Sequence, residues 1–325
     1  CGIALLLAGY RYQEKRAESS LADARSVAWC IDRLKETTGP FFMACGIHRP
    51  HIPFDIPKKY FDMFPLESIE LPEVRADDLD DVPPQGKAFA VPAANGGPHA
   101  RITAMGLWKD RVRAYLACVA FMDARVGELL DALDSSPHRD NTIIVFVGDH
   151  GWHLGEKQHW GKVTLWSEAV RTPMIWVVPG MTPAGSYCDK GVDMMSVYPT
   201  LCKLAGVPVP RHVDGISIVP LLRNPKAKWD VPGLSTMYKG NHTLLTEEWR
   251  YIRYADGTEE LYNHRVDPNE WTNVADRHEY AEVKKKLAAF LPKTEADPVK
   301  ENPERPRRRQ GRLNQPPPAT QAASE

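Results

Sequence analysis

Asp149 and His150 follow an apolar run directly, in the sequence Val-Phe-Val-Gly-Asp-His-Gly that ends at Gly151. A carboxylate beside an imidazole can bind a divalent cation, and the carboxylate favours a hard ion. Residues 141–147 are rich in β-branched and aromatic side chains, which predicts a strand buried on both faces of a parallel sheet. Ligands of open α/β sheets bind beyond the carboxyl ends of such strands, so the position favours a metal site. Alternatively, Asp149 caps the turn and His150 is a structural polar residue.

Lys162 lies in the loop that leaves the same strand end, among tryptophans and histidines that include His159. A lysine is most often a solvated surface residue. Here its ammonium could reach an anion held at the metal, because it is a suitable point-charge partner for phosphate or sulfate oxygens. The sequence therefore pairs a candidate cation site with a candidate anion contact.

Two histidines end a second apolar run, residues 41–47, which is predicted to be another strand. They are His48 and His51, and the prolines beside them restrict the backbone. An imidazole at a second strand end could contact an anion or protonate a leaving oxygen. We favour His48 for this role, whereas His51 is as easily explained as a structural hydrogen-bonding residue.

The elements that must position these residues follow an α/β pattern. Apolar residues at helical spacing predict helices over residues 21–36, 111–133 and 194–204, and a further strand is predicted over 174–178. This order favours a mostly parallel sheet flanked by helices. Beyond residue 210, short alternating segments at 249–254 and 260–262 and a charged helix over 280–291 predict a small antiparallel subdomain.

Composition limits the possible partners. The 325 residues are 43% hydrophobic, enough for one large domain or two smaller ones. Forty-one basic and 42 acidic residues leave a net charge of −1, which gives no global electrostatic reason to expect nucleic acid or an anionic membrane. No apolar run approaches the roughly 20 residues of a membrane span. The six cysteines show no CxxC spacing and are expected to be mostly buried thiols.

Two further segments differ from the folded pattern. Residues 53–98 are rich in proline and acidic residues with little periodicity, which predicts an ordered surface excursion that helps to shape specificity. Residues 294–325 are rich in Pro, Arg, Gln and Ala and are expected to be disordered.

Four separated segments, residues 41–65, 147–162, 192–222 and 249–275, together resemble type I sulfatases of the iduronate-2-sulfatase-like and choline-sulfatase-like branch. The resemblance extends from about residue 20 to about residue 293. It implies an alkaline-phosphatase-like fold, with residues 1–205 as the C-terminal part of the catalytic α/β domain and residues 206–293 as a small α+β subdomain. It also implies a sulfated carbohydrate or similar ester as substrate, and a periplasmic or secreted location.

The resemblance assigns roles to the candidate residues. Asp149 and His150 match the family's calcium ligands, and Lys162 and His48 match positions that contact the sulfate or the bridging oxygen. The family's nucleophile is a formylglycine made from Cys or Ser in a C/S-x-P-S/A-R motif, preceded by a strand that ends in two aspartates.

Neither the C/S-x-P-S/A-R motif nor the strand that ends in two aspartates has a counterpart in this sequence. Residues 135–139 spell S-x-P-x-R in a predicted turn, and residues 45–49 lack the proline. The acidic pairs Asp77-Asp78 and Asp80-Asp81 follow no strand and are expected to be solvated or capping carboxylates. We therefore expect a piece of a longer sulfatase, one that starts at Cys1 and is inactive alone. The alternatives are a phosphoesterase of the same superfamily and a non-catalytic glycan-binding remnant.

Overall fold

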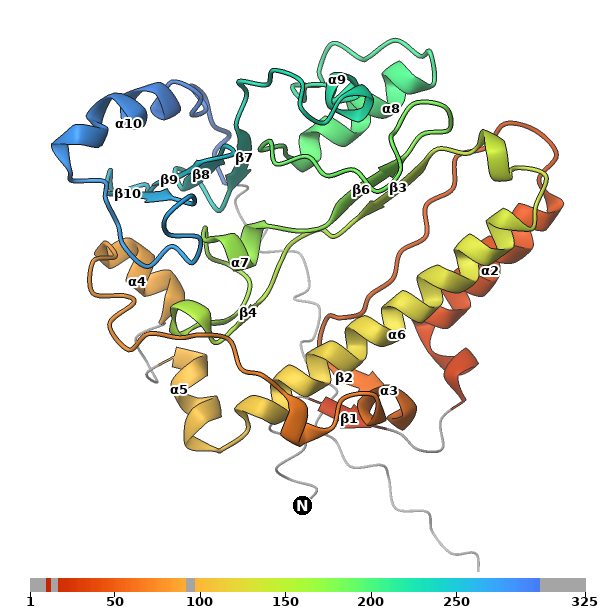
Figure 1. The fold of residues 1–325 in the computed structure, drawn as a ribbon, viewed down its shortest axis with the longest axis horizontal. Coiled ribbons are helices and arrows are strands. Elements are labelled where there is room, and N and C mark those ends of the chain that lie inside the picture. Colours follow the sequence, from red (N-terminus) through yellow and green to blue (C-terminus); the bar gives the residue numbers. More distant parts are fainter. Residues whose placement is uncertain (1–9, 13–16, 92–96, 299–325) are drawn as a thin grey trace, which may run out of the picture.

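The structure is a computed structural model that describes residues 10–12, 17–91 and 97–298 (Figure 1). A pair of long helices lies along one side, a strand pair crosses the middle, and a lobe with an antiparallel sheet lies on the other side (Figure 1). Short 3₁₀ helices connect these parts: η1 (Glu18–Ser20), η2 (Leu66–Ser68), η3 (Arg139–Asn141), η4 (Glu156–Gln158), η5 (Met194–Ser196) and η6 (His278–Tyr280).

The two long helices confirm the two amphipathic patterns. α2 (Ala22–Glu36) buries Val27, Cys30 and Leu34, which recur at helical spacing. α6 (Trp108–Asp134) packs beside it and covers the predicted 111–133 (Figure 1). After α2 the chain runs through residues 41–47 back toward β2, on the side of α6 that faces the β3–β6 strand pair (Figure 1).

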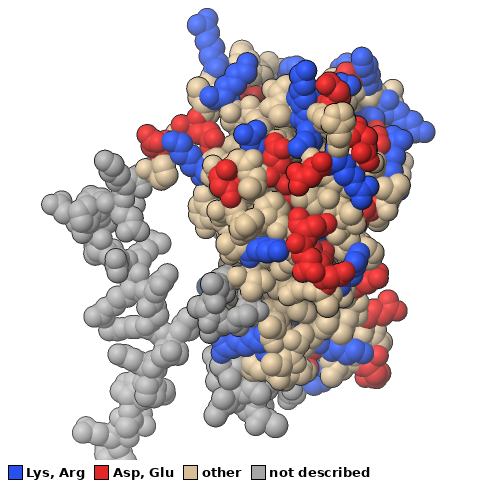
Figure 2. Space-filling view, turned by 90° about the vertical axis from the view of Figure 1, so that its left-hand side faces the viewer, with Lys and Arg blue, Asp and Glu red and all other residues tan. Residues whose placement is uncertain are grey.

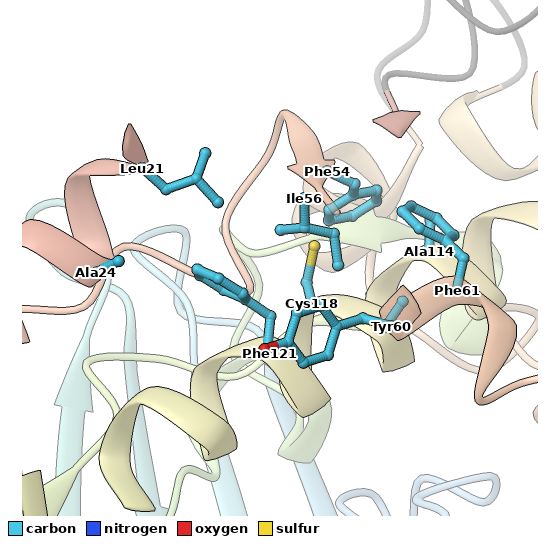
Figure 3. Packing of buried hydrophobic residues seen from close by; sticks show 10 residues of the cluster. Leu21, Ala24, Phe54, Ile56, Tyr60, Phe61, Ala114, Cys118 and Phe121 are labelled. Atoms are coloured by element: carbon cyan, nitrogen blue, oxygen red, sulfur yellow. The ribbon is translucent and has the colours of Figure 1, made fainter. Parts of the chain in front are cut away.

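A compact apolar cluster fixes α6 to the first part of the excursion. β2 (Phe54–Ile56) and α3 (Lys58–Asp62) pack on α6, where the Tyr60 and Phe121 rings meet edge to face at 5.4 Å between centroids. Figure 3 shows the Cys118 thiol directed at the Ile56 side chain. Burial raises the pKa of Cys118 to about 12, so this thiol is unreactive at neutral pH.

The strand that precedes the Asp-His pair is present, but its partner runs in the opposite direction. β3 (Ile144–Val147) pairs antiparallel with β6 (Met174–Val177), and neither strand is buried on both faces, since Ile175 is 55% and Val177 45% exposed. The expectation of a parallel neighbour and two buried faces is therefore wrong for this pair. An apolar run indicates a strand but does not specify the direction of its partner, and here the chain returns antiparallel after an intervening segment, residues 148–173, that contains two short strands and a short helix.

Residues 41–47 do not form the predicted strand. Within the described ranges no strand pairs with them, and Phe42 is 83% exposed. A strand requires hydrogen bonds to a neighbour, which an apolar sequence alone cannot supply.

Further elements complete the α/β part. β1 (Tyr10–Tyr12) pairs parallel with β2, and β4 (His153–Leu154) pairs antiparallel with β5 (Trp160–Gly161). The helix predicted over 194–204 is confirmed as η5 followed by α8 (Val197–Leu204). The remaining helices of this part are α7 (Ser167–Val170) and α9 (Val219–Arg223).

The C-terminal lobe has the antiparallel sheet that the sequence predicts. Its strand order is β10-β9-β8-β7, formed by β7 (Gly233–Thr236), β8 (His242–Leu245), β9 (Trp249–Arg253) and β10 (Glu259–Asn263). α10 (Ala281–Ala288) packs on it through Leu287. After this helix, the Glu295 carboxylate accepts a hydrogen bond from Gly240 N–H at 2.7 Å, whereas residues 299–325 lie outside the described residues.

The excursion over residues 53–98 is ordered where it is described and contains short helices beyond α3. They are α4 (Pro84–Ala90) and α5, whose bounds are Gly97–Ala104. Figure 2 shows the face on which α4 and α5 lie, which is the left-hand side of Figure 1. Basic and acidic side chains are interspersed on this face, with a group of acidic residues near the middle. This mixture matches the near-zero net charge of −1.

Candidate active site at the end of β3

The turn 148–151, which follows β3, is held at both ends by backbone hydrogen bonds. Gly148 N–H donates to the Pro173 carbonyl at 3.1 Å, and Gly151 N–H donates to the Ala169 carbonyl at 2.8 Å. These bonds continue the β3–β6 pairing past the last ladder residue. The turn is therefore fixed to the segment that returns toward β6.

Glycine at position 151 allows a very close approach to α7. A β-carbon there would lie 2.0 Å from the Glu168 carbonyl oxygen, far inside van der Waals contact. Because only glycine lacks that atom, Gly151 allows the backbone of the turn to lie directly against the backbone of α7. Asp149 is exposed at this point, and His150 is partly buried.

The β4–β5 hairpin returns Lys162 to His150. In this hairpin His153 is opposite Gly161, so the next residue, Lys162, comes back alongside the residues that precede His153. The Lys162 Nζ atom lies 2.7 Å from His150 Nε2. The register of a two-residue strand pair thus brings together two residues that are separated along the chain.

The neighbours of His150 determine where its proton lies. Nδ1 faces the Gly151 carbonyl at 2.8 Å and must donate, so Nε2 carries the lone pair that accepts from the Lys162 ammonium. Asp149 Oδ2 lies 3.6 Å from the same Nε2. A lone pair and a carboxylate on the same side are a suitable start for a cation site.

These two groups fit only part of a calcium site. A calcium ion takes six to eight oxygen ligands, which is more than one carboxylate and one imidazole supply. Within the described part of the chain, no group of three or more His, Cys, Asp or Glu side chains could hold a metal ion. The Asp149–His150 pair could therefore contribute to such a site and could not complete it.

The segment with His48 is anchored on α2. His48 N–H donates to Asp23 Oδ1 at 2.8 Å, and the Arg49 guanidinium lies 3.5 Å from Asp23 Oδ2. Arg49 also donates to the Asp55 carbonyl at 3.0 Å. Sequence reasoning missed Asp23, although a carboxylate on the apolar face of a helix beside Val27 was a signal for a buried polar contact.

Aromatic rings connect His48 to the other candidates. The His48 and His51 rings lie 4.6 Å apart, and His51 is 6.1 Å from the Trp152 ring. Trp152 follows the turn 148–151 directly. The two predicted strand ends are therefore neighbours, but among the described contacts His48 does not touch Lys162 or His150.

The loop between β4 and β5 is also tied to the excursion. The buried Lys157 ammonium contacts Asp78 Oδ1 at 2.6 Å and the Glu270 carbonyl, so it joins the loop to residues on both sides. Asp78 is therefore not solvated, which corrects the expectation from its acidic surroundings. Asp81, by contrast, is exposed and accepts a hydrogen bond from Asn273 N–H at 2.8 Å, in agreement with the expectation of a solvated or capping carboxylate.

The motif at 135–139 is a loop, as predicted. Ser135 ends α6, and its hydroxyl donates to the Asp131 carbonyl at 2.8 Å. Its position at the end of a helix is unlike that of a nucleophile at a helix start.

Burial changes the electrostatics next to the turn. It raises the pKa of Glu168 to about 7, and the nearby charge of Glu270 adds to the effect. It also lowers the pKa of His153 to about 3, with repulsion from His159 as the second cause. His153 is therefore neutral at pH 7, with Nδ1 toward the Glu156 carbonyl and Nε2 toward the Thr164 hydroxyl.

Two family profiles match the chain. The sulfatase profile matches residues 7–207, and the profile of the C-terminal region of N-sulphoglucosamine sulphohydrolase matches residues 155–297. The chain belongs to the sulfatase family. This result confirms the resemblance of the four sequence segments, and the first matched range includes the turn 148–151 and Lys162.

Two relatives of known name agree with the sulfatase assignment. A sulfatase of Formosa agariphila is 40% identical over 282 residues, covering 86% of this chain and 55% of the relative. Iduronate 2-sulfatase of Mus musculus is 35% identical over 230 residues, covering 59% of this chain and 41% of the relative. The chain thus spans about half the length of these curated relatives.

The fold is shared with a protein solved in complex with its substrate, D-glucosamine-2-N,6-O-disulfate. The TM-score is 0.66 at 21% identity, covering 83% of this chain and 68% of that one. This likeness confirms the alkaline-phosphatase-like α/β class of the sulfatase. Among the described helices, none combines the length and apolar character that crossing a membrane requires.

Proposed function

We infer that the protein hydrolyses a sulfate ester and that this chain supplies the half of the active site built at the end of β3. The observation that carries this inference is that the Lys162 ammonium and the Asp149 carboxylate both lie close to the same ring nitrogen, His150 Nε2. Lys162 Nζ and Asp149 Oδ2 lie 2.7 and 3.6 Å from His150 Nε2. A cation site and an anion contact would then be adjacent, which suits the binding of a sulfate group.

Asp149 and His150 would hold a calcium ion together with ligands from outside the described residues. Such an ion, when bound, supplies Lewis-acid stabilisation of charge on the sulfuryl oxygens. The Lys162 ammonium, which lies 2.7 Å from His150 Nε2, would be close enough to the same place to contact a sulfate oxygen. Preorganised positive charge of this kind favours the transition state.

His48 would contact the sulfate or protonate the departing oxygen. Its backbone is fixed by Asp23 while its side chain is exposed, so the ring can face a ligand without the segment moving. Imidazole is a suitable general acid near neutral pH.

The substrate would be a sulfated carbohydrate or a similar ester. The names of the relatives support this class, because iduronate 2-sulfatase acts on a sulfated sugar by name and the solved neighbour holds a disulfated glucosamine.

The nucleophile would be a formylglycine contributed from outside these 325 residues, since no C/S-x-P-S/A-R motif stands at a helix start in the printed sequence. The 325-residue chain alone is expected to release no sulfate from an aryl sulfate. Sulfate release by this chain, abolished by Asp149→Ala, would contradict that expectation.

The decisive experiment compares 4-nitrophenyl sulfate with 4-nitrophenyl phosphate, using the protein expressed with its own upstream coding sequence. The sulfate ester should be the better substrate, and Lys162→Ala should lower kcat/KM by about a hundredfold to a thousandfold. Lys228→Ala is the matched control, because that side chain is 86% exposed and distant in sequence. Faster phosphate hydrolysis, or no effect of Lys162→Ala, would exclude the inference.

Calcium binding can be measured by calorimetry on the same protein. Asp149→Asn should weaken binding, because it removes a charged oxygen ligand. Asp140→Asn makes the same chemical change at a side chain that is 98% exposed and should leave binding unchanged. Equal affinity of both variants would remove Asp149 from the metal site.

A further inference from the structure

His159 has a hydrogen-bonding environment that a neutral imidazole cannot satisfy. Its Nδ1 lies 2.8 Å from the Ala90 carbonyl oxygen, and its Nε2 lies 2.9 Å from the Lys162 carbonyl oxygen. Both partners are acceptors, so both ring nitrogens must carry a proton. The ring is buried, with 6% of its surface exposed.

We propose that His159 is an imidazolium that joins α4 to Lys162 and is a positioning residue for Lys162. The proposal rests on the sulfate-binding role of Lys162 proposed above. His159 itself touches no candidate metal ligand and acts only through the Lys162 main chain.

The backbone around Lys162 needs such a restraint. Gly161 and Val163, on either side of it, have φ angles of +99° and +78°. A β-branched residue at positive φ is strained, and such a conformation persists only where surrounding contacts hold it. The His159 hydrogen bond to the carbonyl between these two residues is such a contact.

The contrast with His153 supports the charge assignment. The two rings lie 5.2 Å apart, edge to face. His153 has one acceptor and one hydroxyl as partners, so a neutral ring satisfies it. His159 has two acceptors, so the positive charge belongs on His159.

The other charged groups around the loop already have partners. Lys157 is held by Asp78, and Lys162 directs its ammonium to His150. On α4, whose last residue is Ala90, the ionisable group is Lys87, which donates to the Asp80 carbonyl at 3.2 Å. In the described part of the chain no carboxylate contacts the His159 ring, so its two carbonyl acceptors are its stabilising partners.

The first test measures protonation directly and does not depend on activity. Two-bond ¹H–¹⁵N spectra of the ¹⁵N-histidine-labelled chain report which ring nitrogens carry protons, and the His159 signals are those lost in His159→Gln. We expect both His159 nitrogens to be protonated at pH 7 and His153 to be the neutral Nδ1–H form. A His159 ring with one unprotonated nitrogen at pH 7 would overturn the proposal, whatever the enzyme activity.

The second test measures positioning of Lys162 in the active protein. His159→Gln should raise KM for 4-nitrophenyl sulfate about tenfold, the size expected for loss of one charge-assisted hydrogen bond. The increase should be absent in the Lys162→Ala background, where there is no ammonium to position. His278→Gln, at an exposed histidine, is the control and should change nothing.

The outcomes separate the two proposals. If Lys162→Ala does not impair turnover, the sulfate role of Lys162 fails while the protonation result for His159 stands on its own. If Lys162→Ala impairs turnover but His159→Gln leaves KM unchanged, or raises it equally in the Lys162→Ala background, then the positioning role of His159 is excluded.

Discussion

The hydrogen-bonding partners of His150 decide which of its ring nitrogens carries the proton. Its Nδ1–H is committed to the Gly151 carbonyl, which leaves Nε2 as the only nitrogen that can accept. The same logic assigns a neutral ring to His153 and a charged ring to His159. Three histidines between residues 150 and 159 thus have three different sets of hydrogen-bonding partners.

Glu168 should give the folding stability a measurable pH dependence. Burial first, and then the charge of Glu270, raise its pKa to about 7 from 4.5. A raised pKa means that the folded state holds the proton longer than the unfolded chain, so stability is lost as pH rises from about 4.5 to about 7. Glu168→Gln should therefore be more stable than the wild type by about 1–3 kcal/mol at pH 8 and similar to it at pH 4.

Urea unfolding across this pH range measures the difference. Glu67→Gln, at an exposed position, is the control and should follow the wild type. A Glu168→Gln variant with the same pH profile as the wild type would show that Glu168 does not titrate in this window.

Asp23 should be important for stability as well as for the His48 segment. Asp23→Ala leaves His48 N–H without its acceptor and Arg49 without its nearest carboxylate, which should cost about 2–4 kcal/mol. Asp23→Asn keeps an acceptor and should cost less. Asp32→Asn, 65% exposed on the same helix, should be neutral in thermal unfolding. A neutral Asp23→Ala would show that the segment is held by other contacts.

At the scale of elements, sequence patterns identified α2, α6 and α8, because each has a regular apolar period, and they identified β9 and β10 of the antiparallel sheet but not β7 or β8. They did not identify the direction of β6 or the absence of pairing at residues 41–47, since both depend on a neighbouring strand. For the candidate site, the turn after β3 and Lys162 were predicted from their residue types and from their position after a predicted strand. The Asp78–Lys157 contact was not, because it joins residues that lie 79 positions apart.

The turn 148–151 should tolerate no β-carbon at position 151. Gly151→Ala would place a methyl group 2.0 Å from the Glu168 carbonyl, so the turn or α7 must shift at a cost of about 1–3 kcal/mol. The shift should also separate His150 Nε2 from Lys162 Nζ, which are now 2.7 Å apart.

Gly39→Ala is the matched control for that substitution. An added β-carbon at Gly39 meets nothing within 4 Å, so stability should change little. Equal thermal stability of the two variants would contradict the close packing of the turn on α7.

At the scale of the whole molecule, the strand pair in the middle leaves apolar side chains in solvent. Ile175 and Val177, 55% and 45% exposed, lie on one face of β6. Monomeric proteins rarely expose contiguous apolar surface of this kind. The 325-residue chain should therefore bind a hydrophobic dye and self-associate at high concentration.

The double variant Ile175→Thr, Val177→Thr should reduce dye fluorescence and self-association, measured by light scattering, without loss of folding. Val266→Thr alters an isolated side chain that is 81% exposed and should have no effect. Unchanged dye binding in the double variant would show that the dye does not bind at the exposed face of β6.

The β4–β5 hairpin has a consequence for variation in its loop. Side chains alternate between the two faces of a strand, so the parity of the residue count decides which face Lys162 occupies. With His153 opposite Gly161, one residue inserted between β4 and β5 that shifts this pairing would turn Lys162 away from His150, whereas a two-residue insertion would keep its face. Length changes in this loop should therefore be accepted in even steps and rejected in odd ones.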